Sequence, residues 1–448
     1  MNSAVIDGVI KPLRPADLAP CPQSGEAAAK ATQRPSRWRR LFSFVGPGYL
    51  VAVGYMDPGN WATSLTGGSA FGYSLLSVVL FSSLMAMLLQ AAAVRLGIGS
   101  GLNLAQACRQ HFPAPVNLAL WLGCEVAIVA CNLAEVLGMA CGLNLLFHLP
   151  LVAGVCITAL DVMLVLRLQR GGARPLEVFI IGLVALIGAC VAIQLLWVQA
   201  PLQDVAAGFM PTAQIVTRPE MLYLAVGIIG ATVMPHNLYL HSSLVQARAP
   251  VRASGVKQAI RYATLDSNLA LTMALLVNVG IMVLAAAAFH RLGQAPVVEL
   301  QDAYRLISPV LGASAASTLF GVGLIASGLS SSITGTLAGQ VVMEGFLKIR
   351  MSRAKRALLT RSVAILPAVA VAAWFGHEGV GRLLVLSQVI LGLQLPFAVI
   401  PLLWFTTRRR HLGVYAFRPR TSVILWAVAS SLTAINVWSV WKAIGLTA

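Results

Sequence analysis

Apolar runs follow one another along most of the chain, separated by short polar segments. A helix needs about 20 apolar residues to cross a bilayer, so each run of that length predicts one transmembrane helix. The pattern therefore predicts an all-α polytopic membrane protein with eleven transmembrane helices. The predicted spans are residues 44–70, 72–96, 116–148, 150–167, 176–199, 221–246, 263–289, 312–347, 359–376, 381–406 and 422–446.

The composition agrees with a chain embedded in a lipid bilayer. Of its 448 residues, 58% are hydrophobic and 10% are charged, whereas about 25% of the residues of soluble domains are charged. The net charge of +17 is divided among short clusters between the apolar runs. A nucleic-acid-binding protein would carry a basic stripe instead, so nucleic acid is excluded as a partner.

The basic residues also predict the orientation of the chain. With a cytosolic N-terminus, 27 of the 32 lysines and arginines fall in the predicted cytosolic segments, which is the positive-inside pattern. An odd number of spans then predicts a C-terminus outside. The predicted outer loops contain no Asn-X-Ser/Thr acceptor, which is consistent with a bacterial cytoplasmic (inner) membrane.

The polar, Pro- and Ala-rich beginning of the chain, residues 1–40, contains no apolar stretch followed by a cleavage site. It is predicted to be a disordered cytosolic tail and not a cleaved signal peptide. The seven cysteines lack any paired CxxC spacing, so neither a disulfide framework nor a zinc site is indicated. The sequence also lacks an HExxH helix, and an enzyme is not expected.

The first span contains a carboxylate and two helix breakers in an apolar background. Asp57 is followed by Pro58 and Gly59. Because proline has no N–H, Pro58 leaves the carbonyl of Gly54 without its helical partner. A turn at a helix end is the alternative interpretation of this stretch. A charge and a broken backbone at membrane depth cost free energy unless they line a site, which favours a binding site.

The sixth span contains a matching break around Pro235 and His236, where Pro235 frees the carbonyl of Ala231. Each break lies in the first helix of a predicted five-helix set, at residues 41–200 and 220–406. Since five is an odd number, the second set is inverted relative to the first. Two interrupted spans in corresponding positions indicate a secondary transporter with a site at the midplane.

The chemistry of the groups at the two breaks suggests a metal ion. The oxygen ligands are the carboxylate of Asp57, the amide of Asn60 and the freed carbonyls of Gly54 and Ala231, and Met234 adds a thioether. Oxygen suits hard cations and a thioether suits softer ones, so the mixture fits Mn²⁺ or Fe²⁺ better than Mg²⁺ or Ca²⁺. Taken alone, Met234 is more often a residue that fills a packing gap, and its place beside Pro235 in the break is what favours a ligand.

Several further ionisable groups lie within the predicted spans. His236 can pass a proton to or from Asp57, or it is a neutral, hydrogen-bonded histidine. Glu125 and Glu135 in the third span either continue a proton path or pair with basic groups. Arg356 and Arg361, at the start of the ninth helix, are candidate partners as the alternative interpretation, and the favoured interpretation is that they are positive-inside residues facing a loop.

Two polar residues in other spans are also of interest. Gln388 in the tenth span offers an amide oxygen at membrane depth and is a candidate ligand. Asp266, near the start of the seventh span, is interpreted as an N-terminal cap of that helix.

The motifs at residues 57–60 and 231–236 resemble those of the Nramp divalent-metal transporters, in particular the bacterial proton-coupled manganese branch. Residues 333–346 look like the transport signature of that family, and residues 386–388 with 395–397 are similar to its tenth helix. The resemblance covers about residues 40–446, and the pair of breaks is its most specific part.

The resemblance implies a LeuT-like fold of ten core helices, with residues 421–448 as an eleventh, that imports Mn²⁺ or Fe²⁺ together with protons. Metal and protons would be substrate and coupling ion, with no resident cofactor. The implied metal ligands are Asp57, Asn60, Met234 and the carbonyl of Ala231, with the carbonyl of Gly54 and the amide of Gln388 in some conformations.

The resemblance also implies that protons leave past His236 and Glu135. Here the chain departs from the family pattern, because Asn132 stands where relatives commonly have aspartate. An amide does not carry a proton as a carboxylate does, so either coupling is looser or Glu135 suffices.

The main alternative is a symporter of the same fold that carries a small organic solute such as an amino acid. A substrate carboxylate would bind at a helix N-terminus, where the fixed charge of Asp57 would repel it. A carrier of Mg²⁺ or a trivalent ion is disfavoured by the sulfur of Met234.

Overall fold

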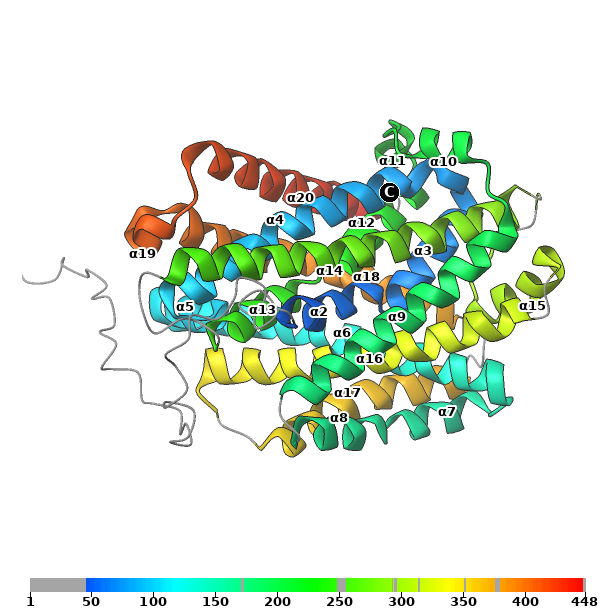
Figure 1. Cartoon of the computed structure of the whole chain (residues 1–448), viewed down its shortest axis with the longest axis horizontal. Coiled ribbons are helices and arrows are strands. Elements are labelled where there is room, and N and C mark those ends of the chain that lie inside the picture. Colours follow the sequence, from blue (N-terminus) through cyan, green and yellow to red (C-terminus); the bar gives the residue numbers. More distant parts are fainter. Residues whose placement is uncertain are drawn as a thin grey trace, which may run out of the picture.

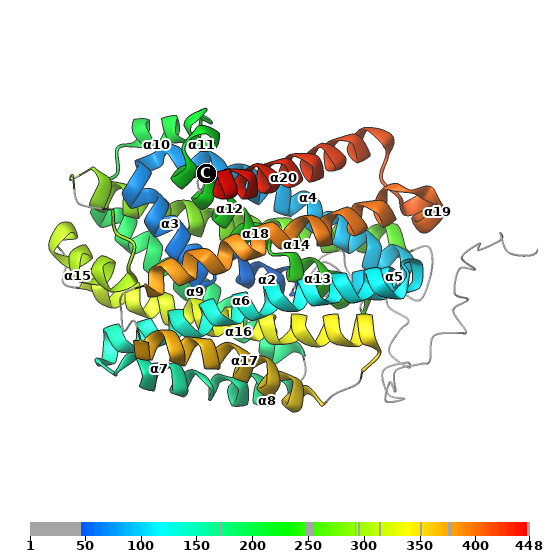
Figure 2. The ribbon, with the colours of Figure 1, turned by 180° about the vertical axis from the view of Figure 1, so that it is seen from behind.

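A computed structural model describes residues 46–170, 173–247, 255–291, 293, 296–312, 315–349, 352–374 and 379–445. The predicted cytosolic tail, residues 1–40, lies outside these ranges. All regular elements in the described residues are helices. Figures 1 and 2 show that the long helices run side by side along the longest axis of the molecule. The prediction of an all-α membrane protein is therefore confirmed.

Every predicted span coincides with helical structure over the residues that the structure describes. Eight helical stretches among the described residues are long and apolar enough to cross a membrane, so the count of eleven stays a prediction. The long unbroken helices are α4 (Leu76–Ser100), α6 (Ala114–Phe147), α9 (Ala173–Val198), α14 (Val256–Ala285), α16 (Ala315–Leu347), α17 (Arg353–Trp374), α18 (Val380–Thr407) and α20 (Pro419–Gly445).

The two predicted breaks are present. The first span is divided into α2 (Pro47–Ala52), a 3₁₀ turn η2 (Val53–Met56) and α3 (Pro58–Phe71), and Asp57 between them is extended. The sixth span is divided into α12 (Pro219–Val233) and α13 (Pro235–Gln246). In both spans a proline begins the second half. At the first position of a helix the N–H group has no partner within that helix, so proline is well tolerated there.

The fourth span, predicted as one helix, is interrupted as well. It consists of α7 (Leu151–Thr158) and α8 (Asp161–Arg170). Two turn residues separate the two helices, and Asp161 begins the second.

Short helices at the two ends of the bundle were not predicted, because they are too short to give a membrane-length apolar run. In Figure 1, α5 and α19 lie at one end, and α10, α11 and α15 lie at the other. Their bounds are α5 (Leu104–His111), α10 (Leu202–Gly208), α11 (Gln214–Thr217), α15 (Leu300–Leu311) and α19 (Arg409–Leu412), with the turns η3 (Gly72–Leu75), η5 (Ala286–His290) and η6 (Gly413–Tyr415).

The interpretation of Asp266 as a cap of the seventh helix is wrong. That helix, α14, begins ten residues earlier at Val256, because the polar residues before the apolar run continue the helix beyond the bilayer. The carboxylate of Asp266 instead accepts the backbone N–H groups of Gly46, at 3.4 Å, and Gly48, at 2.8 Å. It therefore anchors the beginning of α2, where a negative charge complements the helix dipole.

The first broken helix packs closely on α6 because Gly138 lacks a side chain. A Cβ atom at Gly138 would lie 2.1 Å from Cβ of Pro58, well inside van der Waals contact. The proline that starts α3 is thus pressed against the middle of α6, which positions Asp57 near the centre of the bundle.

The close contact between Gly138 and Pro58 predicts that a larger residue at position 138 lowers the stability of the protein. Gly138→Ala forces Pro58 or α6 to shift, and overpacking of this kind costs about 1–3 kcal/mol, so we expect a lower melting temperature of the detergent-solubilised protein. Gly182→Ala is the matched control, since an added Cβ there meets nothing within 4 Å. Equal melting temperatures for the two variants would contradict the proposed contact.

Candidate metal-binding site

Asp57 lies between the halves of the first broken helix and caps α3. Its Oδ1 accepts the backbone N–H of Asn60, at 2.8 Å, and the side-chain Nδ2 of the same residue, at 2.7 Å. The residue is completely buried, and within the described structure its Oδ2 has no hydrogen-bond partner. A buried carboxylate oxygen without a partner is costly, so this atom points to a ligand that the site can receive.

The side chain of Asn60 connects the two breaks. Besides Asp57, its Nδ2 contacts the carbonyl of Ala231 at 2.9 Å, which is one of the carbonyls that the sequence predicts to be freed. Asn278 of α14 donates to the carbonyl of Tyr55 at 2.8 Å and lies 3.5 Å from Oδ1 of Asn60. The carboxylate, the amide and the freed carbonyl therefore form one buried group of polar atoms.

Met234 occupies the second break in a left-handed conformation, with φ 40° and ψ 101°. Such a conformation is strained for a residue with a side chain and is concentrated at functional sites. Its Sδ accepts from Nδ2 of Asn237 at 3.4 Å. A Cβ at Gly54 would lie 2.4 Å from Nδ2 of Asn237 and 3.4 Å from the same sulfur, so the glycine allows the first break to approach the Asn237 amide that contacts the thioether.

Gln388 of α18 reaches the same region from a third side. A Cβ at Gly59 would lie only 1.8 Å from its Nε2, so the amide rests on the backbone that follows Asp57. Its Nε2 donates to Ser387, while Oε1 is buried and unpartnered among the described residues.

The structure thus brings together all six predicted ligand residues. The described residues contain no group of three or more His, Cys, Asp or Glu that could hold a metal. Any ion here would therefore be held mainly by neutral oxygen and sulfur atoms around one carboxylate.

A second polar chain braces the two breaks and was missed. Gln90 of α4 donates to the hydroxyl of Tyr55 at 2.5 Å and contacts Nδ1 of His241 at 2.7 Å. The Tyr55 hydroxyl in turn donates to the carbonyl of Val233, at 3.3 Å, at the end of α12. All of these side chains are buried, so the chain fixes the first break against the second.

The residues predicted to carry protons lie in two places. His236 is buried at the start of α13, and its Nδ1 has no partner in the described part of the chain. Glu125 and Glu135 lie on α6 and each pairs with an arginine of α17. Arg356 binds both oxygens of Glu125, at 2.6 and 2.7 Å, and Arg361 lies 3.2 Å from Glu135.

The interpretation of these arginines as loop residues is therefore wrong. Arg356 and Arg361 are 5% and 2% exposed, because α17 begins earlier than predicted and carries both side chains into the bundle. Their pairing with the two glutamates was the alternative, and the geometry supports it.

Arg361 also binds a carboxylate that sequence reasoning missed. Its Nη2 donates to Asp161 at the start of α8 and, at 2.9 Å, to Ser332 of α16. A single aspartate within the apolar fourth span was the available signal, since intramembrane carboxylates are usually functional. The amide oxygen of Asn132 lies 3.4 Å from Nη1 of the same arginine.

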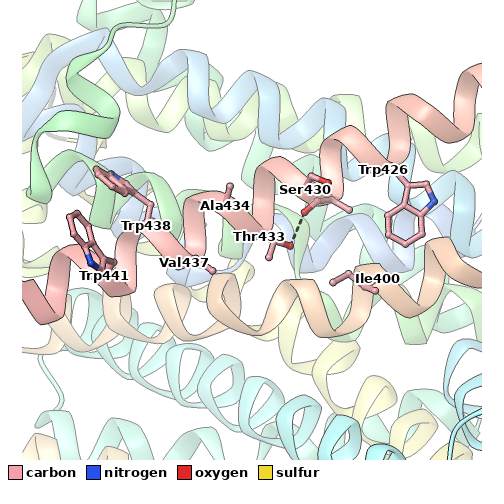
Figure 3. Close-up of a pocket in the computed structure, with 9 residues that line it drawn as sticks. Ile400, Trp426, Ser430, Thr433, Ala434, Val437, Trp438 and Trp441 are labelled. Carbon is pink, nitrogen blue, oxygen red and sulfur yellow. Dashed lines mark hydrogen bonds between the residues drawn. The ribbon is translucent and has the colours of Figure 1, made fainter.

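A groove on the outside of the bundle offers no comparable chemistry. It lies between α18 and α20 and is lined by apolar side chains, including Ile400, Trp426 and Trp441 (Figure 3). The hydroxyl of Thr433 in its wall donates to the carbonyl of Ala429 in its own helix. The groove therefore suits hydrocarbon and not an ion.

Comparison with known proteins agrees with this geometry. Residues 48–442 match the family model described as "Natural resistance-associated macrophage protein-like", or Nramp. A relative from Bradyrhizobium diazoefficiens, named "Divalent metal cation transporter MntH", is 56% identical over 401 residues, which is 89% of each chain.

Solved structures show the same architecture. The manganese transporter of Eremococcus coleocola, in complex with an aromatic bis-isothiourea compound, is 38% identical with a TM-score of 0.82, covering 91% of this chain and 88% of its own. The nucleobase-cation-symport-1 transporter Mhp1 is 16% identical with a TM-score of 0.61, covering 90% and 91%, and shows the shared LeuT-type fold alone. With its two helix breaks and a family match that spans nearly the whole membrane region, this chain belongs to the Nramp family of transporters and is not an enzyme.

Proposed function

We propose that this protein imports divalent transition-metal ions, Mn²⁺ and Fe²⁺, across the bacterial cytoplasmic membrane together with protons. The observation that carries the proposal is the buried Oδ2 of Asp57, which has no partner in the described structure. The other oxygen of this carboxylate shares the Asn60 amide with the carbonyl of Ala231. The relatives named as divalent metal cation transporters support the substrate class.

In the proposed binding step, the ion replaces the amide hydrogens that now occupy the site. The Nδ2 of Asn60 contacts both Asp57 and the carbonyl of Ala231, so its amide group must turn to present oxygen. The ion then takes over two acceptors that the amide had satisfied, and the free oxygen of Asp57 neutralises part of its charge.

The sulfur of Met234 gives the site its proposed preference for transition metals. A thioether binds soft and borderline ions, whereas Mg²⁺ and Ca²⁺ prefer oxygen alone. An organic anion, the main alternative substrate, would meet the buried carboxylate of Asp57 where it needs a positive helix end.

Alternating access would use the two breaks as hinges around the fixed site. Asp57 follows α2 and the turn η2, and Met234 follows α12. The backbones of both residues are already non-helical. We place the N-terminus in the cytosol and the C-terminus outside, with residues 41–200 and 220–406 as the inverted repeats. The membrane potential then favours cation entry by about 2.3 kcal/mol per charge per 100 mV.

Proton coupling would begin at Asp57, because metal ligands bind in their deprotonated form and release a proton when the ion arrives. The proton would then move towards His236 and the acidic groups of α6. His236 and Glu135 are buried in the same bundle as the metal site, and Glu125 is partly buried.

The first test is Asp57→Ala in proteoliposomes that contain a pH-sensitive dye. Loss of the only carboxylate among the proposed ligands removes a charged contact of about 1.5–3 kcal/mol, so we expect Mn²⁺ uptake and its accompanying lumenal acidification to fall by at least about tenfold. The control is Asp204→Ala, which removes an exposed carboxylate. Near-normal uptake by Asp57→Ala would refute the site.

The second test concerns the sulfur. Met234→Ala should transport Mn²⁺ more slowly while excluding Ca²⁺ and Mg²⁺ less well, because the remaining ligands are all oxygen atoms. Met221→Ala, a buried methionine of α12 outside the break, serves as the matched control. An unchanged order of preference across a panel of divalent metals would exclude a role for Met234 in selectivity.

A further inference from the structure

A cluster of buried charged side chains lies beside the proposed ion site, and none of its members is a proposed metal ligand. It consists of Glu135 on α6, Arg361 on α17 and Asp161 on α8, with the neutral side chains of Asn132 and Ser332 next to them. The side chains of the three charged residues are between 0% and 5% exposed.

One guanidinium holds both carboxylates of this cluster. Nη1 of Arg361 lies 3.2 Å from Oε2 of Glu135, and Nη2 donates to Oδ2 of Asp161. Ser332 reinforces the second contact, because its hydroxyl donates to the same oxygen of Asp161 at 2.7 Å. The two acids therefore bind different nitrogens of one guanidinium.

The charges of the cluster do not balance. One positive and two negative groups leave a single negative charge in excess, whereas the neighbouring pair of Glu125 and Arg356 is neutral. An uncompensated buried charge is strongly unfavourable, and one bound proton removes it. The Oδ1 of Asp161 is buried and lacks a hydrogen-bond partner in the described structure, so the cluster has an oxygen that can receive that proton.

Asn132, the other polar side chain of α6 next to Arg361, adds no negative charge to the cluster. Its Nδ2 donates to the carbonyl of Ile128 at 2.8 Å, which turns the amide oxygen towards Arg361. The amide thus solvates the guanidinium and adds no charge.

We propose that Asp161 is the second carboxylate of a proton-holding cluster and that, through Arg361, it sets the proton affinity of Glu135. The inference rests on the proposed coupling of metal transport to protons. When one proton enters from solution, the cluster of Glu135, Arg361 and Asp161 becomes neutral. When the proton leaves, the excess negative charge returns.

The surrounding groups are consistent with this role. The thiol of Cys131 donates to Oε1 of Glu135 at 3.6 Å, and the carboxylates of Asp57 and Asp161 both repel a charge on Glu135. Ser332, the residue of α16 that contacts Asp161 and Arg361, carries no charge. The Glu177 side chain of α9 lies against Gly46 at the start of α2. Arg361 is the cation that faces both acids.

The test compares the pH profile of Mn²⁺-driven proton entry into proteoliposomes for three variants and the wild type. Asp161→Asn leaves one carboxylate against one guanidinium, so proton uptake should require more acid and the midpoint should fall by about one pH unit. Asn132→Asp adds a third carboxylate, and its midpoint should rise. The double variant again has two carboxylates and should return close to the wild-type profile.

A purely structural role for Asp161 would give a different result. Asp161→Asn would then be less active at every pH with an unchanged midpoint, and the double variant would show no rescue, which would overturn the proposal. If Asp161→Asn does not fold, the Asn132→Asp variant is the test. An unchanged or lowered midpoint of its pH profile would contradict the argument that the excess negative charge of the cluster binds the proton. The exposed Asp204→Asn variant should keep the wild-type profile.

The test also separates this inference from the proposed function. Mn²⁺ uptake without any lumenal acidification by the wild type would overturn the proton coupling and with it the role of Asp161. Acidification by the wild type together with an unchanged profile of Asp161→Asn would overturn the role of Asp161 alone.

Discussion

Two interrupted helices meet at the centre of the bundle, and the amide of Asn60 joins them by contacting Asp57 on one side and the carbonyl of Ala231 on the other. Neither interruption can satisfy its backbone by helical hydrogen bonds, and no water is available from a bilayer core. Each break therefore depends on the other. The bond from the Tyr55 hydroxyl to the carbonyl of Val233 joins the two breaks a second time, and the unbroken helices hold this pair in place.

The charged side chains obey the same constraint. Arg356 and Arg361 lie inside an apolar bundle, where an unpaired charge is costly, and each is matched by carboxylates from neighbouring helices. These contacts link α17 to α6 and α8. Charge pairing thus holds together helices that apolar packing alone would leave free to slide.

Much of the architecture could be predicted from the sequence, because bilayer length and backbone satisfaction allow few alternatives. The apolar runs located every long helix, and Pro58 and Pro235 located both breaks. The same residues, with Met234 and Gln388, identified groups that the fold brings together. Asp266 and Asp161 were misread or missed because their partners lie far away in sequence, at Gly48 and Arg361, and no local pattern reveals such contacts.

The unpartnered acceptors of the proposed site also constrain the empty protein. Oxygen atoms of Asp57 and Gln388 that would bind a cation are left without a partner once it departs, so release must be accompanied by hydration of these atoms or by protonation of Asp57. An empty carrier that returns across the membrane would therefore carry water or a proton in place of its ion. The atoms that bind the ion thus also determine how readily the empty protein returns to the conformation that takes up the next ion.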